Sequence, residues 1–313
     1  MEHNVVHHCG FNGNGTQTDW SAGIWGGWFA NKLTFQYNEA YNHYFPAGDG
    51  EGFDIDSYSP NSIYQFNYSH DNQGGFMLTM GDNNHIDSSV VRYNISLNEI
   101  IGDWRGGDYI WVYNNIFART DTITSAYPHY NTLKANFVYN NIFYSASGTQ
   151  VYTVDPSATH SNNLYFPAGT LAESNAVTSD PQFVNAPTTA PLGRLNITGL
   201  KLKATSPAIN AGLAIANNGG LDYWGSKLYN GLPDIGAQEY YDPDTVKIIP
   251  VNLAGSLSKN LRLLDAYIAN KTPVSVYDIS GQLILSHVIF KSTQEYFQLA
   301  GNNERRLILN PEK

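Results

Sequence analysis

This chain of 313 residues has one cysteine, few basic residues and no long apolar run. The single cysteine, Cys9, excludes an internal disulfide framework and a multi-cysteine metal site. No apolar stretch approaches the roughly 18 to 20 residues that a membrane helix needs, so we expect no membrane span. The opening residues, MEHNVVHHCG, lack the basic and apolar regions of a signal peptide, so the sequence shows no export signal.

Basic residues are scarce in the first half above all. Residues 1–165 carry 15 acidic and 5 basic side chains, whereas residues 166–313 carry 12 of each, so the whole net charge of −10 comes from the first half. Nucleic-acid binding depends on Lys and Arg that neutralise phosphates, so this balance excludes nucleic acid as an expected partner. Neutral or cationic ligands fit such a surface better.

The aromatic content is high, with 22 Tyr, 14 Phe and 6 Trp. Asn and Gly are abundant and strong helix formers are sparse, a balance that favours strands and turns. We therefore predict an all-β protein.

A repeat organises the first half of the chain. Segments such as FQYNEAYN, VRYNISLN and FVYNNIFY each place an asparagine before a short apolar or aromatic run, at spacings of 34, 29, 27, 20, 26 and 22 residues. This period, with short strands and variable Gly-rich connections, is typical of a parallel β-helix with one coil per repeat. We expect seven asparagines to stack inside it as a ladder: Asn4, Asn38, Asn67, Asn94, Asn114, Asn140 and Asn162.

A second strand per coil lies between the asparagines, in AGIWGGW, GEGFDID, GGFMLTM and GGDYIWV. Alignment on their glycines places Trp25, Asp54 and Met77 in one column, with Asp108 or Tyr109 next. Because neighbouring coils lie about 4.8 Å apart, we expect one face to gather side chains from several coils. Besides Asp54 and Asp56, its expected members are Trp25, Trp28, His70, Asp71, Asp103, Trp104, Arg105 and Asp108.

Three carboxylates concentrate in GEGFDIDSYSP, residues 50–60. If this stretch is a strand, Phe53 and Ile55 point to one side, and Asp54 and Asp56 to the other. The two aspartates then form either a solvated polar edge or an acid pair that performs chemistry.

The asparagine-bearing coils, together with DGEGFDID and FNYSHDNQGGFML, resemble the right-handed parallel β-helix proteins among secreted bacterial glycoside hydrolases and polysaccharide lyases. The resemblance covers residues 1–240 and includes a closing segment with ATSPAINAG and LPDIGAQEY. It implies a secreted or bacterial cell-surface location. Such proteins normally begin with a cap, so we expect further coils upstream of Met1. Residues 246–313 resemble the small β-sandwich-like sorting domain at the C-terminus of secreted cargo.

From the acid cluster, the flanking tryptophans and the scarcity of cations, we predict a glycoside hydrolase that cleaves a neutral or weakly charged polysaccharide as a monomer. Its expected catalytic residues are Asp54, Asp56 and Glu51. The expected substrate-binding residues are Trp25, Trp28, His70, Asp71, Trp104, Arg105 and Asp108.

Several alternatives stay open at this stage. The resemblance also fits a calcium-dependent polysaccharide lyase, with DGEGFDID supplying oxygen ligands; calcium is the one cofactor considered. A third class is a non-catalytic protein that binds glycans. His70 and Asp71 also suit a turn-stabilising pair, and the tryptophans suit the core. His3, His7, His8 and Cys9 match no zinc spacing, so we assign no metal ligand among them.

Overall fold

The computed structural model describes residues 1–10, 21–44, 49–80, 85–120, 132–149, 152–168, 172–228 and 232–241, together with three strands near the C-terminus. The chain divides into two compact units, Met1–Tyr240 and Tyr241–Lys313. No helix among these residues has both the length and the apolar character needed to cross a membrane.

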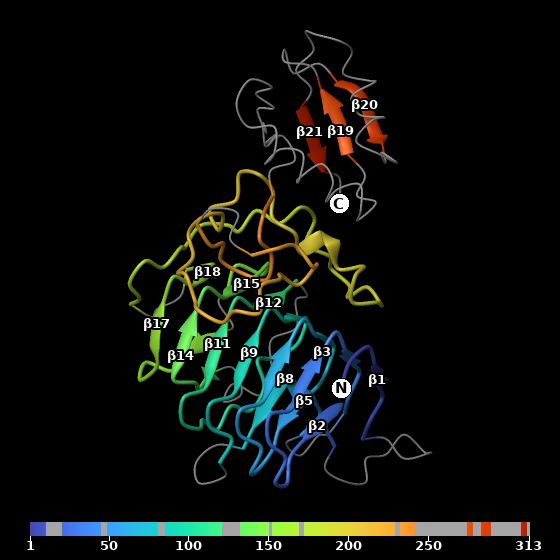
Figure 1. Cartoon of the computed structure of the whole chain (residues 1–313). Coiled ribbons are helices and arrows are strands. Elements are labelled where there is room, and N and C mark those ends of the chain that lie inside the picture. The colour runs from blue at the N-terminus through green and yellow to red at the C-terminus, as the bar shows by residue number, and fades with distance from the viewer. Residues whose placement is uncertain are drawn as a thin grey trace. The chain divides into compact units, whose positions relative to one another are not determined.

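The first unit is a parallel β-helix with three sheet faces (Figure 1). The seven-stranded sheet consists of β1 (Val5–His7), β4 (Glu39–Tyr41), β7 (Tyr68–His70), β10 (Ile95–Leu97), β12 (Ile116–Arg119), β15 (Ile142–Ser145) and β18 (Leu164–Phe166). The six-stranded sheet consists of β3 (Thr34–Gln36), β6 (Ile63–Gln65), β9 (Val90–Arg92), β11 (Trp111–Tyr113), β14 (Phe137–Tyr139) and β17 (Thr159–Ser161).

The third face carries shorter sheets. The β2–β5–β8 sheet consists of β2 (Ile24–Gly26), β5 (Glu51–Ile55) and β8 (Gly75–Thr79), and a separate pair consists of β13 (Thr132–Leu133) and β16 (Thr153–Val154). Each pairing between the strands named above is parallel and joins equivalent strands of successive coils. The predicted all-β class and parallel β-helix are therefore confirmed.

In-register stacking fills the interior of the coils with aromatic columns. Phe117, Phe143 and Tyr165 stack with ring centroids 5.3 and 5.1 Å apart, and Phe35 stacks on Tyr64 at 4.6 Å. These distances are close to the spacing between neighbouring strands, so equivalent residues of successive coils meet directly.

A buried amide ladder runs through the first unit. In each step, the side-chain Nδ2 and the backbone N–H of one asparagine both donate to the Oδ1 of the asparagine one coil on, and the Nδ2–Oδ1 distance is 3.0 Å at each step. The ladder ends at the Glu173 carboxylate. Its members are Asn4, Asn38, Asn67, Asn94, Asn115, Asn141 and Asn163.

The predicted ladder is confirmed for its first four members and wrong by one residue for Asn114, Asn140 and Asn162. In every coil the residue before the ladder asparagine is left-handed, with φ between 50° and 59°. Histidine, tyrosine or phenylalanine takes this position in the first four coils, and asparagine takes it in the later ones. There the side chain points outward instead: Asn140 Nδ2, for example, donates to the Leu213 carbonyl at 2.8 Å.

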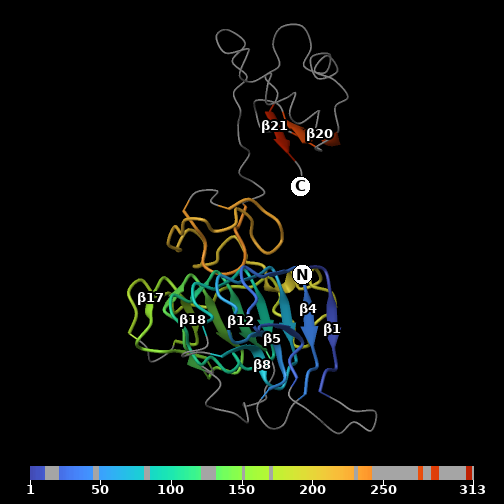
Figure 2. The ribbon, with the colours of Figure 1, turned by 60° about the horizontal axis from the view of Figure 1, so that its bottom comes forward.

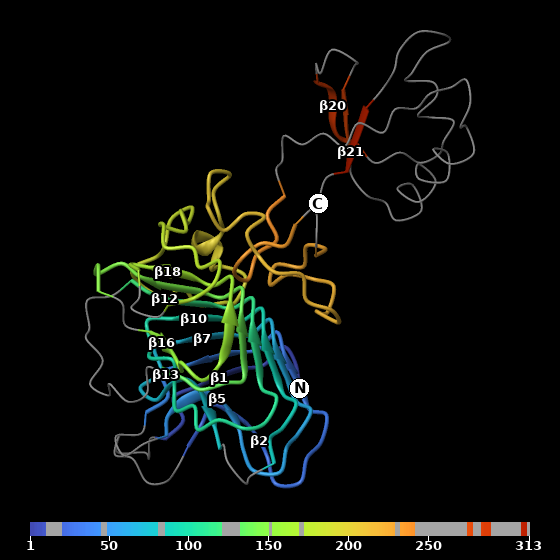
Figure 3. The same cartoon turned by 90° about the vertical axis from the view of Figure 1, so that its left-hand side faces the viewer.

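Residues 172–228 and 232–240 form an irregular segment that covers the outer face of the seven-stranded sheet (Figures 2 and 3) and includes one short 3-10 helix, η2 (Thr198–Leu200). It buries a strip of apolar side chains that includes Ile95, Ile116 and Ile142 from the sheet and Ile197 and Ile235 from the segment. This sheet face is therefore closed to ligands along most of its length.

The second unit contains a three-stranded antiparallel sheet in the order β20–β19–β21, formed by β19 (Val274–Tyr277), β20 (Leu283–Val288) and β21 (Ile308–Pro311). The assignment of residues 246–313 as a sorting domain stays a prediction.

The ladder predicts a large stability effect for one amide. Asn94→Ala leaves the Tyr64 carbonyl and the amide of Asn67 without their buried partners, so we expect a loss of about 2 kcal/mol in the free energy of unfolding, measured by denaturant titration. Asn31→Ala, which removes an exposed amide pair with Asn61, serves as the control and should cost less than about 0.5 kcal/mol. Equal losses in the two variants would contradict the ladder's role.

Candidate functional site

The outer face of the β2–β5–β8 sheet carries the predicted acid pair. Trp25 lies beside Asp54 in the parallel register, while Phe53 and Ile55 are fully buried in the core. The alternation predicted for residues 53–56 is therefore confirmed. The column continues with Leu78, because Met77 pairs with Phe53 and is buried; the predicted position of Met77 is wrong by one residue.

Trp25 and Asp56 are joined across neighbouring coils. The Trp25 indole Nε1 donates to Asp56 Oδ2 at 2.8 Å, and the Trp25 side chain stays 50% exposed. Trp28, in the turn after β2, is 61% exposed. Further along this turn, Phe29 stacks on Tyr58 with ring centroids 4.7 Å apart. The face thus offers flat aromatic surfaces beside a carboxylate.

Asp54 and Glu51 are the two buried acids of this sheet. Asp54 is 5% exposed and Glu51 is 1% exposed. Among the described residues, no hydrogen-bond partner is placed for Asp54 Oδ1 or for either carboxyl oxygen of Glu51. Burial, followed by repulsion from Asp56 and Asp49, raises the pKa of Asp54 well above its usual range. Burial and the neighbouring carboxylates likewise raise the pKa of Glu51.

Two further carboxylates and one guanidinium belong to the same face. Arg105 holds Asp103 Oδ2 through Nε at 2.8 Å and Nη2 at 2.7 Å. Asp49 interacts electrostatically with Arg105, Asp103 and Asp56, and burial raises its pKa. Sequence reasoning placed Asp103 and Arg105 on this face but missed Asp49. The signal for Asp49 was its position just before the strand, on the chain segment that enters the same face.

We call the set formed by Asp49, Glu51, Asp54, Asp56, Asp103 and Arg105, together with Trp25, the acidic face.

Trp104 is not part of the exposed surface. It is 3% exposed, lies in the core and donates its indole Nε1 to the Ile101 carbonyl at 2.9 Å. The bridge between Thr79 and Trp104 aligns it with the inward column that contains Ile55, so the predicted sugar contact is wrong. In a strand, a shift of one residue exchanges the two faces.

Asp108 also lies away from the acidic face. Its backbone N–H donates to Asp87 Oδ1 at 3.1 Å in the turn that leads into β11, and the place in the third face falls instead to residues 103–105. The glycine alignment that assigned Asp108 to the column of Asp54 is therefore wrong.

His70 and Asp71 belong to the seven-stranded sheet, so their predicted place on the carboxylate face is wrong. His70 is 1% exposed; its Nδ1 lies 2.9 Å from Asp71 Oδ2 and its Nε2 lies 3.2 Å from Glu39 Oε1. Both Glu39 carboxyl oxygens accept the Gly193 N–H of the covering segment, at 2.8 and 3.0 Å. The histidine thus supports the attachment of that segment.

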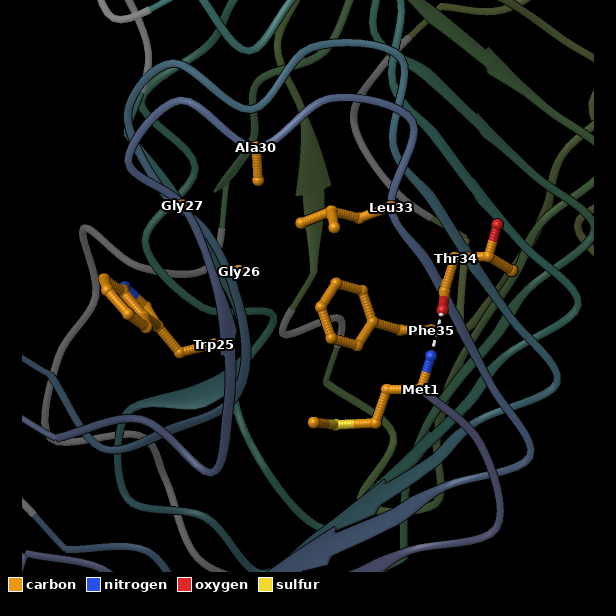
Figure 4. Close-up of a pocket in the computed structure, with 8 residues that line it drawn as sticks. All are labelled: Met1, Trp25, Gly26, Gly27, Ala30, Leu33, Thr34 and Phe35. Atoms are coloured by element: carbon orange, nitrogen blue, oxygen red, sulfur yellow. Dashed lines mark hydrogen bonds between the residues drawn. The ribbon is translucent and has the colours of Figure 1, made fainter.

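Among the described residues, no three His, Cys, Asp or Glu side chains are placed to hold a metal ion. An apolar cavity of about 330 Å³ opens near the first coil, lined by Met1, Trp25, Gly26, Gly27, Ala30, Leu33, Thr34 and Phe35. Figure 4 shows the Trp25 ring pointing away from the Leu33 and Phe35 side chains of this cavity. The acidic face itself contributes only Trp25 to it.

Comparisons with known proteins assign this chain to no family. No protein-family model and no curated protein matches the sequence. Among solved structures, the crystal structure of pectate lyase Pel9A is similar with a TM-score of 0.45 and 15% sequence identity, over 77% of this chain. The chain spans 65% of the length of that structure.

The buried Glu51 predicts a specific pH dependence. Its pKa in the folded state lies above the ordinary value of 4.5, so folding binds an extra proton and the free energy of unfolding falls as the pH rises above 4.5. Glu51→Gln removes this pH-dependent loss of stability. We expect the variant to be more stable than the parent at neutral pH, by roughly 1 kcal/mol or more, and to lose this advantage below pH 4.5. Denaturant titrations at both pH values test this; an advantage that persists in acid would contradict it.

A second pH effect follows from His70. Burial alone would lower its pKa, but the hydrogen bonds to Asp71 and Glu39 outweigh burial and raise it above 6.5. Its contribution to stability is therefore complete below pH 6.5 and is lost as the pH rises through the raised pKa. In thermal unfolding across this range, His70→Gln should show a smaller pH dependence than the parent. An unchanged pH dependence would mean that another group titrates.

Proposed function

We propose that this protein acts on polysaccharides, and that it is a glycoside hydrolase with its active groove on the acidic face. The observation that carries the proposal is the placement of a buried acid, Asp54, two residues from a partly exposed acid, Asp56, beside the exposed Trp25 ring. Unequal environments for two neighbouring carboxyls are what acid–base hydrolysis of a glycosidic bond requires.

The two aspartates take different roles in this proposal. Asp54, with its pKa raised by burial and by the neighbouring carboxylates, serves as the general acid. Asp56 accepts the Trp25 indole N–H and the Ser57 backbone N–H, and its side chain is partly exposed. It serves as base or nucleophile. Residues i and i+2 of a strand lie about 6.8 Å apart, which allows either a retaining or an inverting reaction.

The remaining residues of the face bind the sugar or adjust the electrostatics around Asp54. Trp25 and Trp28 provide stacking surfaces for sugar rings, and Arg105 contacts sugar hydroxyls at the groove edge. Glu51 is 1% exposed, so we assign it an electrostatic role behind Asp54 in place of the predicted direct catalytic role.

The lyase alternative needs a basic side chain that abstracts a proton. Arg105 is the basic side chain described on the acidic face, and its pair with Asp103 outweighs burial and raises its pKa, which keeps it protonated. This argument favours hydrolysis over elimination. We extend the proposal to an extracellular location, where polysaccharides occur.

The hydrolase proposal predicts a loss of turnover in two variants. Asp54→Asn and Asp56→Asn should each reduce kcat by at least about 100-fold in a reducing-sugar assay, because each removes one partner of acid–base catalysis. Asp180→Asn, an exposed aspartate in the covering segment, is the matched control and should keep parental activity. Circular dichroism should show an intact β fold in all three variants.

Two outcomes would replace the proposal. Products with the ultraviolet absorbance of an unsaturated uronate would establish a lyase. A protein that binds oligosaccharides, shows no turnover on a polysaccharide panel and keeps its affinity in Asp54→Asn would instead be a glycan-binding module that uses the exposed tryptophans alone.

A further inference from the structure

The acidic face carries more negative charge than two catalytic carboxyls require. Three of its carboxylates, Asp49, Asp56 and Asp103, are partly exposed, and Asp54 and Glu51 lie behind them. One guanidinium, Arg105, opposes the three exposed carboxylates, and it is already paired with Asp103. Such an excess repels a polyanion and attracts a cation.

The two buried acids behind the exposed carboxylates have acceptor oxygens without partners in the described part of the chain. Asp54 Oδ1 and both Glu51 carboxyl oxygens have no hydrogen-bond partner among the described residues, although both side chains are at least 95% buried. Buried acceptors without donors are costly in a folded protein. Asp54 interacts electrostatically with Asp56 and Asp49, and Glu51 with Asp49 and Asp103, so both acids lie near the exposed carboxylates.

The exposed aromatic rings of the face favour a sugar ligand. Trp25 and Trp28 lie exposed beside the carboxylates, and flat rings of this kind stack on sugar faces. Among the described residues, no set of three side chains is placed to hold a metal ion. A ligand that combines pyranose rings with separated positive charges satisfies both the aromatic and the acidic parts of the surface.

We propose that the acidic face selects a polysaccharide with free amino groups, such as a glucosamine polymer. This inference rests on the proposed function and names its substrate class. The ammonium groups donate charge-assisted hydrogen bonds to Asp49, Asp56 and Asp103, while the sugar rings stack on Trp25 and Trp28.

Calorimetric titration of the full chain tests the proposal, with short oligomers of glucosamine, of N-acetylglucosamine and of galacturonate as probes at mildly acidic pH. We expect the glucosamine oligomer to bind on the order of 10-fold more tightly than its acetylated counterpart, with an affinity that falls as salt increases. Asp103→Asn should weaken this binding several-fold, whereas the matched control Asp180→Asn should not change it. Arg105→Gln should strengthen it, because it removes the opposing charge.

Three results would overturn the inference: equal or tighter binding of the acetylated or uronate oligomer, no binding of any probe, or binding of calcium alone that the Asp103→Asn change abolishes. The proposed function fails separately. Hydrolysis of an uncharged polysaccharide without preference for glucosamine would contradict the proposed substrate class but not the hydrolase proposal. Tight glucosamine binding without turnover on any polymer would contradict the hydrolase proposal but not the proposed ligand class.

Discussion

The amide ladder is the constraint on which the rest of the structure depends. A polar side chain inside an apolar coil is tolerated only if its donors and acceptors are paired, and here each asparagine pairs with its counterpart one coil on. This requirement fixes the register of successive coils at one point. Because the flanking strands are only a few residues long, it also sets which side chains share a column in the adjoining six- and seven-stranded sheets.

The β2–β5–β8 sheet lies away from the ladder, and its outer face carries charged side chains. On the acidic face, the third strand slips by one residue relative to a glycine alignment, and residues 103–105 replace the strand of the fourth coil. Carboxyl groups then come together, and among the described residues Asp54 Oδ1 and both carboxyl oxygens of Glu51 have no hydrogen-bond partner. Burial and mutual repulsion raise the pKa values of Asp54 and Glu51. Their environment therefore differs from that of the partly exposed Asp56.

The covering segment explains why similar residue types serve different purposes on different faces. On the seven-stranded sheet, Glu39 receives the Gly193 N–H and His70 supports it, so these titratable groups attach one part of the chain to another. Arg194 adds to this attachment, with its guanidinium 5.0 Å from the centre of the Tyr37 ring and 4.8 Å from that of Tyr223. No comparable covering segment is described over the acidic face, where Trp25 and Trp28 stay exposed.

Sequence alone determined the features that repeat. The period of the asparagine motif indicated the parallel β-helix and the first four ladder positions, and the alternation of residues 53–56 indicated which side chains face outward. These features follow from the spacing of residues along the chain, which can be read without knowledge of the tertiary contacts.

Only the tertiary structure decided which asparagine of each Asn-Asn pair turns inward, because the outer one is selected by the carbonyls of a segment about 50 to 120 residues away. It also turned Trp104 into the core, moved Asp108 into a turn and assigned His70 to another sheet. In a strand with a two-residue period, loops of unequal length shift the register by one, and a shift of one residue exchanges core for surface.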